Sequence, residues 1–406
     1  MKKNILFVWP PQTMFHGSLF KHITHLGETL DYVSKNIECN LNFMDAGVEM
    51  FSSKQFVNEF SKTDYLYIYC EVYTIENSIK LAKMAKQVNP NIKIMGFGKA
   101  CCYMPNYYIS SGYYDAIVDN GFWEKPMIDF ANDMINEDSA QMITKDGRIG
   151  KIKPILPEEW GIPMIEKMPI ETYFKLTNKR QLEIAAAKGC PYNCSFCSEK
   201  FVYGKKEGRR TVDSMIEYIE KTHHLCDPYY FNAPTFTYDV EWVKDLCNRI
   251  INLPYKIKWC AVTRLDEIDE EIISLMSKAG CYRLSVGVET LNKNVQVSIK
   301  KPINYDMMIN MFNLLKKYNI KPRALLMIGL KEQTKQDILD TINLIKEMDL
   351  DFRIKEYAPY NEILNDNSTI EQIRRFDRTE YCSEDVQIDG LSVDEYMQLI
   401  FADKGR

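Results

Sequence analysis

The stretch Lys188-Gly-Cys190-Pro-Tyr-Asn-Cys194-Ser-Phe-Cys197 lies directly behind a run of residues, 181–187, that is typical of a buried strand. Thiolates are the protein ligands of iron–sulfur clusters, and a cluster with four irons normally takes one thiolate for each iron. This loop offers only three thiolates, so one iron keeps an open coordination site. An open site allows a metal to bind a substrate or cofactor directly, as it does in catalytic rather than structural zinc centres. The loop therefore predicts a catalytic [4Fe-4S] cluster held by Cys190, Cys194 and Cys197.

The same loop has two alternative interpretations. It could form a zinc site with three thiolate ligands, or its cysteines could be ordinary buried core residues. A disulfide framework is not indicated for the 12 cysteines of the chain, because their spacings show no pattern of a small stapled domain. We expect a reducing compartment, in which thiols stay free.

The residues that follow the loop alternate between strand-like and helix-like runs. Strands are expected at 181–187, 228–233, 256–262, 282–288, 322–329 and 352–357. The runs between them carry apolar residues at helical spacing, as at Val212, Met215 and Ile219. Six strand–helix units over residues 181–360 predict a partial (β/α)6 barrel of the TIM-barrel type. In such folds the active site lies at the carboxyl ends of the strands.

Residues 1–125 show a second alternating series. Strands are expected at 4–9, 40–44, 65–70, 92–95 and 114–118, and helices at 19–33 and 76–88. Strands that alternate with helices indicate a parallel sheet covered on both faces. The fold class is therefore α/β, and this part is predicted to be a doubly wound, Rossmann-like domain.

The two alternating series are joined by residues 126–180, which we interpret as a connector. Five prolines interrupt this range: Pro126, Pro154, Pro157, Pro163 and Pro169. The polar range 361–406 is interpreted as a tail or a small cap.

The net charge and the hydropathy of the chain argue against some kinds of binding partner. The net charge of −5 gives no electrostatic reason to expect a nucleic acid. No run approaches the ~20 apolar residues of a membrane helix, and the apolar start is broken by Pro10 and Pro11 too early for a signal peptide. We therefore expect a cytoplasmic protein without a membrane partner, acting on a small molecule or a peptide.

With Phe196 just before its last cysteine, the loop resembles the signature of the radical S-adenosylmethionine (SAM) superfamily, and the resemblance covers residues 181–357. In that family the open iron binds the amino and carboxylate groups of SAM. An electron from the cluster then splits SAM into methionine and a 5′-deoxyadenosyl radical. The resemblance implies a [4Fe-4S] cluster and SAM as cofactors, and a reductase, flavodoxin or ferredoxin as electron donor.

Further segments at strand ends resemble those that contact SAM in the family. The implied contact residues are Phe196, Asn232, Pro234, Thr263, Arg264, Glu289 and Ile328. Glu289 is expected to accept a hydrogen bond from SAM, and the alternative is a structural carboxylate paired with Arg264 or Arg283. Relatives often read Gly-Leu-Pro-Gly-Glu-Thr after the fifth strand, whereas this chain reads Gly329-Leu-Lys-Glu-Gln-Thr334. Thr334 is still expected to cap a helix.

A doubly wound domain ahead of the barrel resembles the cobalamin-binding class of the same superfamily. The resemblance implies cobalamin contacts at Thr74, Gly96 and Gly98, where glycines permit the close backbone approach of a phosphate-bearing tail. The Asp-x-His-x-x-Gly loop, which gives many cobalamin proteins a cobalt ligand, is absent from the chain. The alternative is a vestigial domain that only supports the barrel.

The resemblance predicts a cobalamin-dependent methyltransferase that acts on an unactivated carbon of a small-molecule or peptide substrate. The alternative is a cobalamin-independent radical SAM dehydratase, epimerase or cyclase, in which Cys281 or Tyr357 donates a hydrogen atom or a proton. A third hypothesis is a sensor that binds an iron–sulfur cluster or cobalamin without catalysis. The intact three-cysteine signature argues against the sensor, and an assay of SAM cleavage would distinguish the two classes.

Overall fold

The computed structural model describes residues 2–12, 22–265, 268–357, 370 and 388–401, and these residues divide into two compact units. The first unit contains Met1–Lys179 together with Phe201–Tyr203, and the second begins at Arg180. The fold class predicted from the sequence is confirmed, because both units are built on largely parallel sheets with helices between the strands.

The first unit contains a seven-stranded sheet in the order β2-β1-β3-β4-β5-β6-β7. Its strands are β1 (Lys3–Trp9), β2 (Cys39–Asp45), β3 (Tyr65–Tyr69), β4 (Lys93–Phe97), β5 (Ala116–Ile117), β6 (Met142–Thr144) and β7 (Gly147–Ile149). The first five strands run parallel to one another. The order 2-1-3-4-5 reverses direction between β1 and β3, and a doubly wound sheet binds its ligands at such a switch point.

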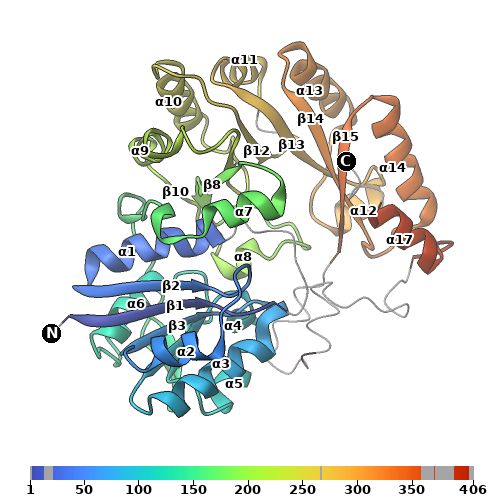
Figure 1. The fold of residues 1–406 in the computed structure, drawn as a ribbon. Coiled ribbons are helices and arrows are strands. Elements are labelled where there is room, and N and C mark those ends of the chain that lie inside the picture. The colour runs from blue at the N-terminus through green and yellow to red at the C-terminus, as the bar shows by residue number, and fades with distance from the viewer. Residues whose placement is uncertain (1, 13–21, 266–267, 358–369, 371–387, 402–406) are drawn as a thin grey trace. The chain divides into compact units, whose positions relative to one another are not determined.

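The helices of this unit cover both faces of its sheet, as the handedness of the crossovers requires. The chain moves from β1 to β2 in one direction and then back past β1 to β3, so right-handed crossovers place the two connecting helices on opposite faces. The helical segments are η1 (His22–Gly27), α1 (Glu28–Asn36), α2 (Ser53–Phe60), η2 (Val72–Thr74), α3 (Ile75–Val88), α4 (Lys99–Tyr103), α5 (Pro105–Ser110) and α6 (Glu124–Ala131). In Figure 1, α1 lies on one side of β1 and β2, and α2 and α3 lie on the other.

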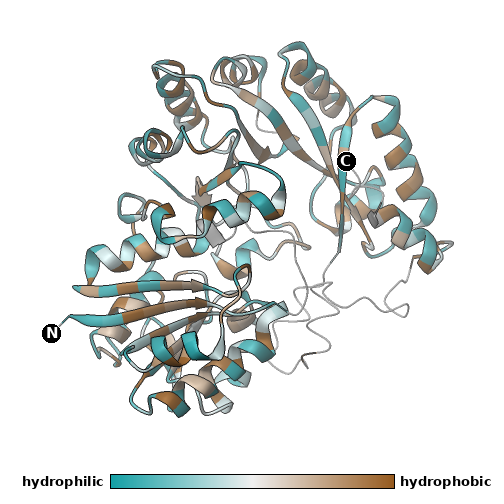
Figure 2. Cartoon of the chain, viewed as in Figure 1, coloured by the Kyte–Doolittle hydropathy of each residue, from teal (hydrophilic) through white to brown (hydrophobic). Residues whose placement is uncertain are grey.

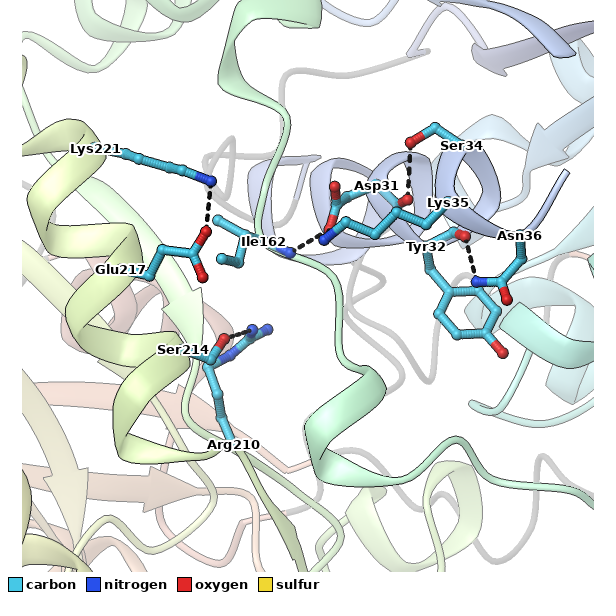
Figure 3. Close-up of polar contacts among 10 residues, drawn as sticks. All are labelled: Asp31, Tyr32, Ser34, Lys35, Asn36, Ile162, Arg210, Ser214, Glu217 and Lys221. Carbon is cyan, nitrogen blue, oxygen red and sulfur yellow. Dashed lines mark hydrogen bonds and ion pairs between the residues drawn. The ribbon is translucent and has the colours of Figure 1, made fainter. Parts of the chain in front are cut away.

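The range predicted as a connector adds structure to the first unit. Strands β6 and β7 extend the sheet in the antiparallel sense, and η3 (Pro157–Glu159), η4 (Ile165–Lys167) and α7 (Ile170–Thr177) follow. This range is tied to α1, because the carboxylate of Asp31 accepts a hydrogen bond of 2.8 Å from the backbone N–H of Ile162 (Figure 3). The prolines interrupt the periodicity without preventing these contacts.

The second unit contains a six-stranded parallel sheet in the order β15-β14-β13-β12-β11-β8. Its strands are β8 (Leu182–Ala185), β11 (Tyr229–Asn232), β12 (Trp259–Thr263), β13 (Cys281–Glu289), β14 (Lys321–Ile328) and β15 (Asp351–Glu356). All six predicted strands are confirmed within a few residues. A short antiparallel pair, β9 (Ala187–Lys188) and β10 (Gly208–Arg209), stands beside them. The sheet is an open, partial barrel with no ladder between β15 and β8 in the described residues.

Along one face of this sheet, outside the strands in Figure 1, lie α9 (Val212–Thr222), α10 (Val240–Ile251), α11 (Glu270–Lys278), α13 (Tyr305–Lys317) and α14 (Lys335–Glu347). The second unit also contains α12 (Lys293–Ser298) and α17 (Val393–Phe401), and the short α8 (Glu199–Val202) begins in it. A side chain at the helix start caps each of α9 to α14, and these capping residues are Thr211, Asp239, Asp269, Asn292, Asn304 and Thr334. The predicted cap at Thr334 is confirmed, and Asp337 completes a capping box with it.

Aromatic side chains fill the space between the strands and the helices of the second unit. The ring centroids of Phe231 and Phe236 each lie 5.1 Å from that of Trp259, whose indole N–H donates to the carbonyl of Ala279. Truncating a buried phenylalanine such as Phe231 to alanine costs about 3–5 kcal/mol. Figure 2 shows hydrophobic residues along the strands, while many helix positions that face outward are hydrophilic.

Two predicted segments lie partly outside the residues that the structure describes. The predicted helix 19–33 is present from His22 as η1 and α1, and its first residues lie outside the described residues. Most of the predicted tail 361–406 also lies outside them, apart from residue 370 and the segment that contains α17. Among the described helices none is long and apolar enough to cross a membrane.

Candidate functional site

The three-cysteine loop follows β8 and the short β9, at the carboxyl end of the first strand of the barrel sheet. Several backbone hydrogen bonds hold it in place. The N–H of Cys190 donates to the carbonyl of Gly204, and the N–H of Ser195 donates to the carbonyl of Ile299 at 3.0 Å. The carboxylate of Glu199 accepts from the N–H of Gly189 at 3.0 Å. The loop is therefore anchored both to the chain that follows it and to α12.

The three thiols are shielded from solvent to different degrees. Cys194 is buried, and Cys190 and Cys197 are partly buried. Burial, followed by the charge of the neighbouring Cys194, raises the pKa of Cys190 to about 12. Burial likewise raises the pKa of Cys197 to about 12. Without iron these groups stay protonated, so metal binding must displace their protons.

The spread of the thiols bears on the zinc alternative. Within the described part of the chain, no three histidine, cysteine or acidic side chains come close enough to hold a single metal ion. All ligands of one ion must lie within one bond length of it, whereas each thiolate of a [4Fe-4S] cluster binds its own iron. Three thiolates on one loop can each bind a separate iron, so the donor set is compatible with a [4Fe-4S] cluster that keeps one iron open.

Arg264 contacts this loop directly. It follows β12, and its Nη1 lies 3.6 Å from the Sγ of Cys194. The guanidinium also stacks over the ring of Tyr192, with 3.9 Å between its central carbon and the ring centroid. A permanent positive charge beside a thiolate stabilises negative charge on the sulfur. The sequence predicted Arg264 as a SAM contact, and the structure places it against a cluster cysteine.

Glu289 forms a buried ion pair with Lys301. The Nζ of Lys301 lies 2.6 Å from the Oε1 of Glu289, and the two side chains are only 8% and 9% exposed. The alternative partners expected from the sequence were Arg264 and Arg283, and the ion pair is made with neither. Glu289 ends β13 with a positive φ of 61°, at a break in the register with β14. Such strained backbone persists only where its surroundings fix it, and the ion pair supplies one such contact.

Gly287 leaves room for this ion pair. A Cβ at this position would lie 2.2 Å from the Nζ of Lys301 and 2.7 Å from the Oε1 of Glu289. The Nζ of Lys301 also lies 5.9 Å from the ring centroid of Phe196 in the cysteine loop. Sequence reasoning missed Lys301, because it lies 12 residues beyond Glu289 and carries no motif of its own. The glycine two residues before the acidic strand end was the available signal.

The other predicted SAM contacts also lie at strand ends, apart from Phe196. Asn232 ends β11, and its amide donates to the carboxylate of Glu183 on β8 at 2.6 Å. Pro234 follows in the next turn and is half-buried. Thr263 ends β12, where its hydroxyl is hydrogen-bonded to that of Thr237. Ile328 ends β14 and is fully buried. Contact of these residues with SAM stays a prediction.

Phe196 and Tyr357 pack against the same apolar cluster. The cluster consists of Val295, Ile299, Met327 and Leu330, all buried. Tyr357 directly follows β15, so it lies at the carboxyl edge of the sheet. The packing links the cysteine loop to the ends of β14 and β15, which is where the barrel fold places its chemistry.

Cys281 occupies the opposite edge of the sheet. It is the first residue of β13, buried, and burial raises the pKa of its thiol. The strand rises by about 3.3 Å per residue, so Cys281 lies some eight residues and ~26 Å from Glu289 along β13. This placement gives no support to a catalytic role for Cys281.

The residues predicted to contact cobalamin have local structural roles in the first unit. The hydroxyl of Thr74 accepts from the N–H of Glu71, donates to the carbonyl of the same residue, and is fully buried. Gly98 has a φ of 108°, and a Cβ there would lie 2.8 Å from the carbonyl oxygen of Cys70. A Cβ at Gly96 would meet Ile117 at 2.6 Å. The two glycines therefore permit close packing within the protein, and their contact with cobalamin stays a prediction.

Comparison with known proteins agrees with this geometry. Residues 184–345 match the model of the Radical SAM superfamily. An uncharacterized methyltransferase of Pyrococcus horikoshii is 26% identical over 221 residues, which are 51% of this chain and 48% of the relative. The anaerobic magnesium-protoporphyrin IX monomethyl ester cyclase of Rubrivivax gelatinosus is 25% identical over 303 residues, which are 69% of this chain and 53% of the relative. The chain thus spans about half the length of these curated relatives.

A solved structure shares the fold over most of the chain. It is the radical SAM methyltransferase TsrM of Kitasatospora setae with cobalamin and a [4Fe-4S] cluster bound. The TM-score is 0.72 at 14% identity, with 88% of this chain and 72% of TsrM covered. At this identity the likeness concerns the fold.

Proposed function

We propose that this chain, which contains a radical SAM domain, is a cobalamin-dependent methyltransferase that methylates an unactivated carbon of a small-molecule or peptide substrate. The observation that carries the proposal is the loop of Cys190, Cys194 and Cys197, which offers three thiolates at the carboxyl edge of a partial barrel. Three protein ligands leave one iron of a [4Fe-4S] cluster open for SAM. When bound, the cluster supplies the electron that splits SAM, and cobalamin supplies the methyl group.

The protein's own residues hold and orient these groups. Cys190, Cys194 and Cys197 hold the cluster, and the guanidinium of Arg264 beside Cys194 balances negative charge there. Glu289, oriented by Lys301, accepts hydrogen bonds from the amino group or ribose of SAM. The apolar cluster around Met327 and Leu330 keeps water away from this edge, which protects a reactive radical from side reactions.

The role of cobalamin has separate support. The strand order 2-1-3-4-5 of the first unit gives a ligand-binding switch point between β1 and β3. The Kitasatospora enzyme that shares the fold binds cobalamin as well as a cluster. The Pyrococcus relative is named a methyltransferase, which supports methyl transfer as the outcome. A reductase, flavodoxin or ferredoxin would deliver the electron.

The proposal is tested with protein that contains a reconstituted cluster and has been prepared with and without added cobalamin. Retained cobalamin should be visible in the absorption spectrum after gel filtration, with no histidine bound to cobalt, because the Asp-x-His-x-x-Gly loop is missing. Reduced protein should convert SAM to 5′-deoxyadenosine. Protein that cleaves SAM but never retains cobalamin would favour the cobalamin-independent dehydratase, epimerase or cyclase. Protein that holds no cluster would overturn the radical SAM function altogether.

A further inference from the structure

The helices that the structure describes leave one face of the barrel sheet uncovered, and basic side chains gather on that face. Along β13, Leu284, Val286 and Val288 are all 0% exposed, and this complete burial assigns them to the face that the helices cover. Side chains alternate along a strand, so Arg283 and Ser285 point to the opposite face. We call this opposite face the inner face of the sheet.

The register of the strands places two more arginines on the inner face. Ser285 pairs with Arg323 of β14, and Leu325 of β14 pairs with Arg353 of β15. Paired residues of neighbouring strands share a face, and so do residues two apart on one strand. Arg283, Arg323 and Arg353 therefore all face the same side, from three adjacent strands.

These arginines differ in how their charge is balanced. Arg323 donates two hydrogen bonds to one carboxylate oxygen of Asp351, at 3.0 Å from Nε and 2.7 Å from Nη2. Neither Arg283 nor Arg353 has a carboxylate within ion-pair distance among the residues that the structure describes. Arg353 is exposed.

Of the two arginines without an ion-pair partner, Arg283 has the more unusual surroundings. Its Nη2 lies 3.5 Å from the Sγ of Cys260, a weak acceptor, and its Nε is buried without a hydrogen-bond partner. A buried N–H that lacks an acceptor costs free energy, and such a group calls for an explanation, of which a missing ligand is one.

Tyr230 lies on the same face of the sheet as both arginines, on a strand nearer the other end of the strand order. Tyr230 lies on β11 and pairs with Cys260, which pairs in turn with Arg283, so its side chain is on the inner face. Burial and the charge of Glu183 raise the pKa of Tyr230, while the charges of Arg353 and Arg283 lower it. Both guanidinium groups therefore lie within electrostatic range of this phenol, although they come from β13 and β15.

We propose that the inner face binds an acidic group of the substrate, a carboxylate or a phosphate, between Arg283 and Arg353, with the hydroxyl of Tyr230 as a further donor. This inference rests on the proposed function, because it names the substrate class of the same barrel. A guanidinium presents parallel donors that match both kinds of oxyanion, and an anion would supply the acceptor that Arg283 lacks.

The position of the site constrains the substrate further. Arg353 is level with Leu325 and Gly287 in the register, and Gly287 lies two residues before Glu289. Two residues of a strand correspond to about 7 Å. The acidic group would therefore sit on the order of 7 Å or more below the edge where Glu289 and the cysteine loop meet SAM. The substrate would carry its acidic group away from the carbon that reacts.

The first experiment measures anion binding to the whole chain without cluster, SAM or cobalamin. Thermal unfolding is recorded with increasing inorganic phosphate or sodium acetate, and sodium chloride keeps the ionic strength constant. Wild-type protein should show a saturable rise in Tm with phosphate, acetate or both, and the stronger anion identifies the acidic group. Arg283→Gln and Arg353→Gln should each weaken that binding about tenfold or more. Arg249→Gln is the matched control, because Arg249 pairs with Asp213 on the helix side of the unit.

The outcomes of this titration decide the proposal. No saturable rise in wild type, or a rise that survives in both inner-face variants, would overturn it. Since no cofactor is present, anion binding can succeed or fail independently of SAM cleavage. Loss of SAM cleavage in a protein that still binds anions would count against the proposed function and leave the anion site standing.

A second measurement separates a binding role from a structural one. If Arg283 only fills the sheet interior, Arg283→Met should lower the midpoint of urea unfolding in buffer without anions. If Arg283 is retained to bind an anion, the same variant should keep or raise that midpoint, because it removes a charge without an acceptor. A lowered midpoint would contradict the proposal even if the arginine variants bind anions poorly.

Discussion

The buried Glu289–Lys301 ion pair lies at the end of β13, where we propose that SAM binds, and substituting Lys301 tests how strongly the pair stabilises the barrel. Lys301→Met keeps most of the side-chain volume and removes the positive charge. The Glu289 side chain, only 9% exposed and at a backbone φ of 61°, would then lack its 2.6 Å partner. Removing one member of a buried ion pair typically costs about 3–5 kcal/mol, because the remaining charge is uncompensated.

The double variant makes the reasoning quantitative. Glu289→Gln alone should cost a comparable amount, because Lys301 is then the uncompensated charge. In Glu289→Gln with Lys301→Met neither charge remains, so the loss of stability should be smaller than the sum of the two single losses by about 2 kcal/mol or more. Urea unfolding followed by circular dichroism measures these values, and the two units are fitted as separate transitions.

An exposed ion pair provides the control. Lys317 and Glu270 lie 2.5 Å apart in the same unit, with side chains 61% and 48% exposed. Lys317→Met should leave the unfolding midpoint unchanged, since solvent screens such pairs. Two results would refute this reasoning. One is that the losses of unfolding free energy in the Glu289 and Lys301 variants simply add, and the other is that Lys301→Met loses no more than Lys317→Met. In protein loaded with the cluster, Lys301→Met should also weaken SAM binding, because the carboxylate of Glu289 then lacks the partner that orients it.

Three further predictions concern the cluster and the first unit. Cys194→Ala should lose the brown absorption, iron and SAM cleavage together, and retention of four irons per chain would contradict the ligand assignment. Arg264→Gln should lower the reduction potential of the cluster by tens of millivolts, because the reduced cluster carries more negative charge and the variant removes a positive charge beside Cys194. A redox titration followed by electron paramagnetic resonance measures this potential, and an unchanged value would contradict the prediction. Gly98→Ala should destabilise the protein by about 1–3 kcal/mol even without cobalamin, since its Cβ would meet the carbonyl of Cys70. Gly112→Ala, which also has a positive φ but open space around the Cβ, should cost less in the same unfolding experiment.

Much of the fold could be predicted because its signals are local. The barrel strands are short runs of apolar or alternating apolar and polar residues between turn residues, and the helices that follow repeat their apolar positions every three or four residues. Capping residues such as Thr334 act on their own helix, so the sequence predicted that cap correctly. The three cysteines are equally local, because a single loop brings them together. Short elements without a strong period, such as β6, β7 and α2, were not predicted.

The contacts that define the site could not be predicted, because they join residues that are distant along the chain. Arg264 meets Cys194 across 70 positions, a contact that sequence reasoning did not predict, while its predicted contact with SAM stays a prediction. The partner of Glu289 proved to be Lys301, a residue without a motif.

The convergence of Arg283 and Arg353 on one face depends on strand order and register, which no local pattern encodes. A one-residue shift in register would turn a side chain to the opposite face of the sheet. The sequence by itself thus determined most of the elements and the placement of three cysteines on one loop. Only the packed structure decided which charges are paired and which are left for a ligand, because charge balance is set by neighbours in space.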